Sequence, residues 1–418
     1  MNTQEFLNSE YTQSLLERFI RYVKVWTESD EEAADRGIMP SAERERDLAA
    51  ILCDELSSLG LQNVQTTEHC YTYGFLPATP AFKDKEPFCL LAHTDTVSEV
   101  SGKDVKPIVW KNYDGKNLEL ECGVVHSVKN DSALEQAARD GDTIITGDGS
   151  TLLGADDKAG VAEIMTALEY FHSHPEAEHR AIEVIFSPDE ETGHGMDKVP
   201  LELLKSKYAY TVDGGHIGEL ETECFNAFKA EVIFTGKPKH TGTARPDMIN
   251  AVNMISYFIR SLPQNQMPET TDEYQGFFAP MSLEADMEKA KAVLFLRDFT
   301  SDGMEKRKSL VKLLAETTAE VYGGKAEVIF TQQYLNMKEG LDKAPYVTEN
   351  LIKAYRASGI EAVFKPIRGG TDGSRLTEMG IPCPNIFTGG HNFHSRYEWA
   401  ALSQMCAAVK VLIELCGK

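Results

Sequence analysis

The sequence predicts an α/β protein with a mixed central sheet flanked by helices, into which an α+β domain is inserted. Two observations support this fold class. At 418 residues the chain is longer than one hydrophobic core usually serves, so two domains are expected. Its first half alternates short, β-rich apolar runs with helical periodicity, which is the pattern of a sheet covered by helices.

The elements can be assigned in chain order. Around a helix at 159–174, apolar runs predict strands at 88–95, 181–191 and 208–215. From about Phe225 the pattern is that of a half-exposed sheet with helices beside it, giving strands at 228–236 and 291–299 and helices at 250–262 and 305–324. After about Asn336 helix and strand resume, at 346–358, 361–367, 384–390 and 403–416.

We therefore predict one domain from residues 1–222 and 337–418, and an inserted domain from residues 223–336. The run 228–236 is a candidate edge strand of the inserted sheet. Because exposed edges tend to be paired or covered, this strand suggests a surface for a homodimer.

The charge balance argues against two classes of partner. With 65 acidic and 42 basic residues the formal net charge is −23, which disfavours binding to nucleic acid and to anionic membranes. Small or cationic substrates fit better, although solubility alone also explains such a charge.

Cysteine usage and the N-terminus indicate where the protein works. The eight cysteines are scattered without a C-x-x-C pair, so neither a disulfide framework nor a thiolate zinc site is expected. The first residues mix charges with apolar residues at helical spacing and lack the apolar core of a signal peptide. We expect a cytoplasmic protein.

Acidic and histidine residues follow the apolar strands, where open α/β sheets place their ligand sites. These candidates are His93, Asp95, Asp156, Asp157, Glu190, Glu191, Asp213, His391 and His394. Taken singly, each has an ordinary explanation, such as helix capping or a solvated charge run. Because several such features coincide in one α/β half, they favour a shared metal centre.

The residue types indicate the chemistry. His93 and Asp95 leave the same face of an extended segment, so one can bind metal while the other orients it. A carboxylate of the 156–157 pair can bridge two cations, and in the 190–191 pair one glutamate can bind metal while its neighbour moves protons. Imidazole and carboxylate without thiolate suit zinc, cobalt or manganese at a catalytic site, and zinc is the first choice.

At these residues the sequence closely resembles the peptidase T family of tripeptide aminopeptidases, which belongs to a superfamily of co-catalytic metallopeptidases and deacylases. The likeness runs nearly end to end. It is carried by AHTDT at His93, TLLGADDKAG around Asp156, SPDEETG at Glu190, YTVDGGHIGELE at Asp213, FLRDF at Arg297, IRGGTDGS at Arg368 and GIPCPNIFTGGHNFH before Ser395. The resemblance implies a zinc-peptidase-like catalytic domain with an inserted lid or dimerisation domain.

The resemblance also implies a role for each residue. Two zinc ions per subunit would be held, with cobalt or manganese as substitutes. Asp156 would bridge them, His93 and Asp213 would complete one site, and Glu191 and His394 the other. Asp157 is then not the bridge.

Further roles follow from the same resemblance. Asp95 would support His93 from behind, and Glu190 would act as general base on a water between the two ions. His240 of the insert would donate to the oxyanion of the transition state, unless it is an ordinary loop histidine. Arg297 and Arg368 are candidates for binding the peptide carboxylate, or else ordinary ion-pair partners.

Two histidines depart from the family pattern. His216 stands where a small residue is usual, and His391 lies three residues before His394. We keep His394 as the ligand because it follows an aromatic residue, as in the family motif. A deacylase, desuccinylase or carboxypeptidase of the same superfamily, or a non-catalytic metal-binding protein, are the alternatives. The GGTDGS and NIFTGG segments argue against the first group, and an intact Glu190 argues against the second.

Overall fold

The computed structural model describes residue 6 and residues 9–417. The chain divides into two compact units. The first comprises Met1–Thr222, Glu339–Lys365 and Thr371–Lys418, and the second comprises Glu223–Lys338 and Pro366–Gly370.

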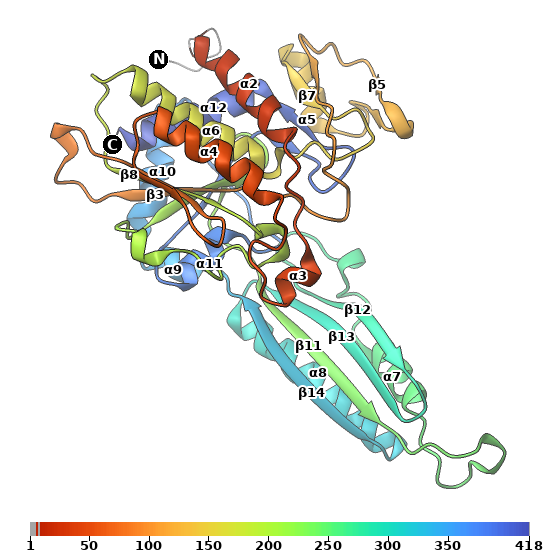
Figure 1. Cartoon of the computed structure of the whole chain (residues 1–418). Helices are drawn as coiled ribbons and strands as arrows, with labels where there is room; N and C mark the ends of the chain where they lie inside the picture. Colours follow the sequence, from red (N-terminus) through yellow and green to blue (C-terminus); the bar gives the residue numbers. More distant parts are fainter. Residues whose placement is uncertain (1–5, 7–8, 418) are drawn as a thin grey trace. The chain divides into compact units, whose positions relative to one another are not determined.

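The first unit is built on an eight-stranded sheet (Figure 1). In order across the sheet, its strands are β1 (Gln62–Thr66), β2 (Thr72–Leu76), β8 (Ile182–Ser187), β3 (Phe88–His93), β9 (Ala209–Gly214), β16 (Asn385–Phe387), β10 (Glu219–Glu221) and β15 (Val363–Phe364). The four strands from β8 to β16 are parallel to one another, whereas β1, β2 and β10 pair with antiparallel neighbours. The predicted mixed sheet is therefore confirmed.

Helices flank this sheet. Helix α6 (Ala155–Ser173) packs directly on β3 and β9, and α2 (Glu10–Val23) and α12 (Leu402–Cys416) pack on α6. The approach of α6 to β9 depends on Gly160, because a Cβ there would lie 1.8 Å from the Val212 carbonyl oxygen. Helices α4 (Glu45–Ser58), α10 (Pro345–Ala357) and α11 (Asp372–Glu378) complete the covering.

Two small sheets complete the first unit. One has the order β17 (Gly390–His391), β18 (Trp399–Ala401), β7 (Ile144–Thr146) and β4 (Ile108–Trp110), and the other pairs β5 (Leu118–Glu119) with β6 (Val125–His126). Strand β18 connects directly to α12, so the segment before it is held against the main body of the unit.

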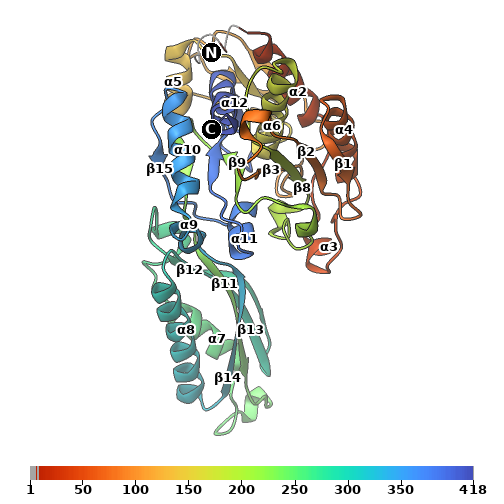
Figure 2. The same cartoon turned by 90° about the vertical axis from the view of Figure 1, so that its left-hand side faces the viewer.

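The second unit is an antiparallel four-stranded sheet with two helices on one face (Figure 2). The strand order is β12 (Phe277–Ala285), β13 (Lys289–Asp298), β11 (Asn226–Thr235) and β14 (Lys325–Tyr334). Helices α7 (Ala251–Ser261) and α8 (Ser301–Tyr322) bury alternate residues of these strands in a single core.

This order corrects one expectation. The run 228–236, which we predicted as a candidate edge strand, falls largely in β11, and β11 lies inside the sheet between β13 and β14. The edges are β12 and β14. The physical reason is that a half-exposed strand shows the same alternation whether it has one neighbour or two.

Among the described residues, no helix is both long enough and apolar enough to cross a lipid bilayer.

Candidate metal centre

The centre begins where parallel strands end. His93 is the last residue of β3, Asp213 lies one residue before the end of β9, and Glu190 follows the end of β8 by three residues. His93 pairs in register with Ser187, the last residue of β8. Parallel strands that end at one edge bring the side chains that follow them together.

Asp156, in the first turn of α6, lies between two histidines. Its Oδ1 is 2.9 Å from Nε2 of His93, and its Oδ2 is 3.1 Å from Nε2 of His394. The side chain is largely buried, with 13% of its surface exposed. One carboxylate thus presents a separate oxygen to each imidazole, which is the geometry of a bridging ligand.

One further carboxylate lies beside each histidine. Asp213 Oδ1 is 3.5 Å from His93 Nε2, and Glu191 Oε2 is 3.1 Å from His394 Nε2. Among the described residues, the ligand atoms of His93, Asp156 and Glu191 lie close enough to one another to hold a metal ion. The structure therefore brings together all five residues predicted as ligands.

Asp157 lies equally close to the centre, and its oxygens also gather with His93 and Asp213. Both of these oxygens, however, accept backbone hydrogen bonds, at 3.2 Å from the His93 N–H and 3.1 Å from the Gly160 N–H. These two bonds hold the end of β3 against α6 and occupy one lone pair on each oxygen of Asp157.

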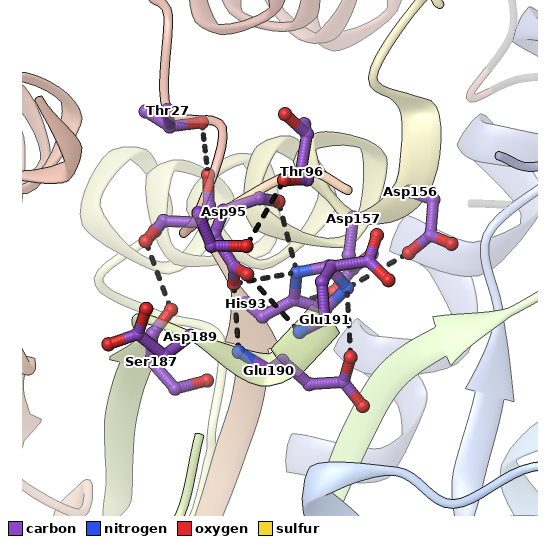
Figure 3. A network of polar contacts seen from close by, with 12 residues as sticks. Thr27, His93, Asp95, Thr96, Asp156, Asp157, Ser187, Asp189, Glu190 and Glu191 are labelled. Carbon is purple, nitrogen blue, oxygen red and sulfur yellow. Dashed lines mark hydrogen bonds and ion pairs between the residues drawn. The ribbon is translucent and has the colours of Figure 1, made fainter. Parts of the chain in front are cut away.

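Asp95 stands behind His93 and faces its other ring nitrogen (Figure 3). Asp95 Oδ1 is 3.4 Å from His93 Nδ1, and the Asp95 side chain is completely buried. The same carboxylate accepts the backbone N–H groups of Glu190 at 3.0 Å and Glu191 at 3.2 Å. His93 Nδ1 also lies 3.2 Å from the Asp95 backbone carbonyl, so Asp95 contacts the imidazole through its backbone and its side chain and anchors the turn that carries both glutamates.

Glu190 and Glu191 are directed differently. The Glu190 carboxylate comes within 4.0 Å of His93 Nε2, whereas Glu191 faces His394. The second oxygen of Glu191, Oε1, is buried without a hydrogen-bond partner in the described part of the chain. Since a buried, unpaired carboxylate oxygen is costly, this atom fits a site that receives a cation.

Burial dominates the electrostatics of these acids. It raises the pKa of Glu191 to about 8, of Asp213 to about 6 and of Glu190 well above its usual range. It also opposes ionisation of Asp156, but hydrogen bonds from His394 and His93 outweigh it and hold the pKa of Asp156 below its usual range. The centre thus favours positive charge at its middle.

The same balance is visible at His394. The His394 side chain is 48% exposed. Its partial burial lowers the pKa of the imidazole, but hydrogen bonds to Asp156 and Glu191 raise it to about 11. The raised pKa favours a proton on His394, which a cation between the imidazole and the two carboxylates would displace. This set of donor atoms is suited to exchanging a proton for a metal ion.

The two unassigned histidines do not join the centre. The rings of His216 and His391 lie 5.4 Å apart, and His391 stacks on Trp399 at 4.1 Å. Neither belongs to the two groups of possible metal ligands in the described chain; His394 also lies outside these groups, but it contacts Asp156 and Glu191 at 3.1 Å.

The three candidate substrate-binding or catalytic residues of the second unit have different surroundings. His240 is exposed, and its Nδ1 accepts the backbone N–H of Gly242. Arg297 is buried within the sheet beside Tyr334. Arg368 donates to the backbone carbonyls of three residues in the segment 271–275. The roles that we predicted for these three residues stay predictions.

Three buried acids near the centre were missed by the sequence reasoning. Asp372 accepts a hydrogen bond from the Ser187 hydroxyl at 2.5 Å, Asp189 accepts the Ser41 backbone N–H, and Glu398 lies four residues after His394. Asp372 could have been found from the GGTDGS segment, in which it is the only acid. A single glutamate beside a tryptophan gives no comparable signal for Glu398.

This chain is similar to a known protein family and to named relatives. Residues 148–418 match Peptidase family M20/M25/M40. A protein named Peptidase T from Clostridium perfringens is 43% identical over 400 residues, which cover 96% of this chain and 97% of the relative.

Two solved structures show the same fold. An aminopeptidase PepT from Bacillus cereus has a TM-score of 0.76 at 23% identity, and a tripeptidase from Staphylococcus aureus has a TM-score of 0.77 at 22% identity. Each comparison covers 97% of this chain and 98% of the other. The resemblance predicted from the motifs is confirmed, and this chain belongs to Peptidase family M20/M25/M40.

Proposed function

We propose that this chain is a two-metal aminopeptidase that removes the amino-terminal residue from short peptides, above all tripeptides. The observation that carries the proposal is the position of Asp156, whose two oxygens face His93 and His394. Family membership supports peptide hydrolysis, and the names of the relatives support the choice of aminopeptidase and tripeptide.

The donor set suits two zinc ions per subunit, with cobalt or manganese as substitutes. His93 and Asp213 would hold one ion, Glu191 and His394 the other, and Asp156 both. When bound, such ions lower the pKa of a water molecule from about 16 to about 7 and offset negative charge on the scissile carbonyl oxygen.

The protein side chains supply the proton transfers. Glu190 would take the proton of the attacking water and return it to the nitrogen of the leaving peptide. Its neighbour Glu191 is directed at His394 and so is not free for this task. Asp95 accepts the backbone N–H of Glu190 at 3.0 Å. This hydrogen bond helps to hold the proposed base in position.

Three residues of the second unit would act on the substrate. His240 would donate a hydrogen bond to the developing oxyanion, and Arg297 and Arg368 would bind the carboxylate of the peptide. The carbonyl contacts of Arg368 weigh towards a structural task for that residue. A homodimer formed through this unit, and a cytoplasmic location, complete the proposal; sedimentation and cell fractionation are the measurements that test them.

A substrate panel tests the activity. We expect the purified, zinc-supplied protein to release the first residue of unblocked tripeptides faster than that of dipeptides or tetrapeptides, and to leave N-acetylated tripeptides intact. Chromatography of the products identifies which residue is released. Release from the carboxyl end, or cleavage of N-acyl amino acids instead of tripeptides, would contradict the proposal.

Metal removal should destabilise the protein, because the crowded carboxylates lose their counter-charge. We expect a chelator to lower the melting temperature and added zinc to restore it, with a gain of about 2.7 kcal/mol when zinc is at 100 times its Kd. Asp156→Asn should greatly reduce this gain. Identical melting of the chelated and zinc-supplied proteins would refute the metal centre.

Replacing Glu190 separates proton transfer from metal binding. Glu190→Gln should lower kcat by about 10²–10⁴-fold while metal content, measured by elemental analysis, stays that of the parent. The exposed Glu202 provides a control, and Glu202→Gln should leave both quantities unchanged. Activity that survives Glu190→Gln would sink the assignment of the base.

His240→Ala tests the contribution of the second unit. Loss of an oxyanion donor should lower kcat by about 10²-fold or more, with metal content and melting temperature unchanged. Steady-state kinetics on a tripeptide gives the answer. An unchanged turnover would leave His240 with only its local contact to Gly242.

A further inference from the structure

One carboxylate outside the proposed ligand set is bonded to the backbone that carries Asp156. Glu398 is 1% exposed, and its Oε2 accepts the N–H groups of Leu153 at 2.8 Å and Gly154 at 2.7 Å. Its Oε1 accepts the N–H of Asp156 itself at 3.0 Å. Three backbone donors of one loop thus converge on a single side chain.

Glu398 also belongs to the segment that carries His394. It lies four residues after His394 and directly before β18, whose pairing with β7 fixes the backbone there. Glu398 and Asp156 are 242 positions apart in the sequence, so no local structure sets their distance. The Glu398 carboxylate therefore ties together the two segments that approach each other at the 3.1 Å contact between Asp156 and His394.

We propose that Glu398 is a positioning residue for the metal centre, because it holds the Leu153–Asp156 backbone so that Asp156 faces both His93 and His394. The inference rests on the proposed two-metal centre but not on its substrate. Groups that orient metal ligands typically change metal affinity by about 10–100-fold when they are replaced.

A carboxylate suits this position. Two oxygens with several lone pairs can accept three N–H groups, and hydrogen bonds to a charged acceptor are stronger than neutral ones. Glutamine has the same shape but one acceptor oxygen, and its NH₂ group would face a backbone donor. Glu398→Gln therefore removes part of the clamp without leaving a cavity.

Glu183 provides a matched control. It is also completely buried, and its carboxylate accepts the backbone N–H groups of Lys205 at 3.0 Å and Ser206 at 2.8 Å and the Tyr73 hydroxyl at 2.9 Å. It lies near the start of β8, four residues before the end that faces the centre. At about 3.3 Å per residue this is roughly 13 Å along the strand.

The experiment is calorimetric titration of the metal-free proteins with Zn²⁺. The parent should bind two equivalents, and Glu398→Gln should bind one of them about 10–100-fold more weakly. Glu183→Gln should keep both affinities within about threefold of the parent. This should hold even if its metal-free melting temperature falls as far as that of Glu398→Gln. Raising the zinc concentration should restore tripeptide cleavage by Glu398→Gln.

Two results would overturn the proposal. One is parent-like affinity of Glu398→Gln for both equivalents, and the other is equal weakening by Glu183→Gln, which would indicate general destabilisation. If Glu398→Gln does not fold, Glu398→Asp, which keeps the charge on a shorter side chain, should show the same selective loss, and parent-like binding by it would be equally fatal. A parent that binds two zinc ions but cleaves no peptide would refute the proposed function and leave this inference standing.

Discussion

The constraint on which the rest of the site depends is the crowding of negative charge in a buried space. The ends of two parallel strands and two turns direct four carboxylates at two imidazoles; these acids are Asp156, Glu190, Glu191 and Asp213. Burial raises the pKa of three of them, because water no longer solvates the charge. The repulsion within such a cluster is relieved by protonation of the acids themselves, by protonated histidine or by metal ions.

The two members of each pair of adjacent acids make different contacts. Asp156 faces the two histidines, whereas the oxygens of Asp157 are directed at backbone N–H groups. Glu191 is directed at His394, which leaves Glu190 beside the centre. In the proposed mechanism, Asp156 is thereby available to the metal ions and Glu190 to a proton.

A second set of buried carboxylates binds the backbone beside the first set. Asp95 and Asp157 bond to the backbone around the ligands, and so does Glu398. Hydrogen bonds between a charged carboxylate and backbone amides are stronger than those between neutral groups, so they favour one position of the loop. The ligands can then lie close together without the metal having to gather them.

Part of this arrangement could be predicted from the sequence. Motifs at strand ends identified His93, Asp156 and Asp213, since strand, turn and charge lie within a few residues of one another. The clamp by Glu398 could not be predicted, because its partners are backbone amides in a distant segment and leave no trace in residue types. The position of β11 inside its sheet was missed for a similar reason, since the pairing strand β14 is about 100 residues away.

The most direct test of the account is anomalous X-ray scattering at the zinc edge from crystals of the zinc-supplied protein. The account predicts two zinc peaks, both in contact with the carboxylate of Asp156, one beside His93 and Asp213 and the other beside Glu191 and His394. A single peak, or two peaks bridged by Asp157 with Asp156 turned away, would contradict it.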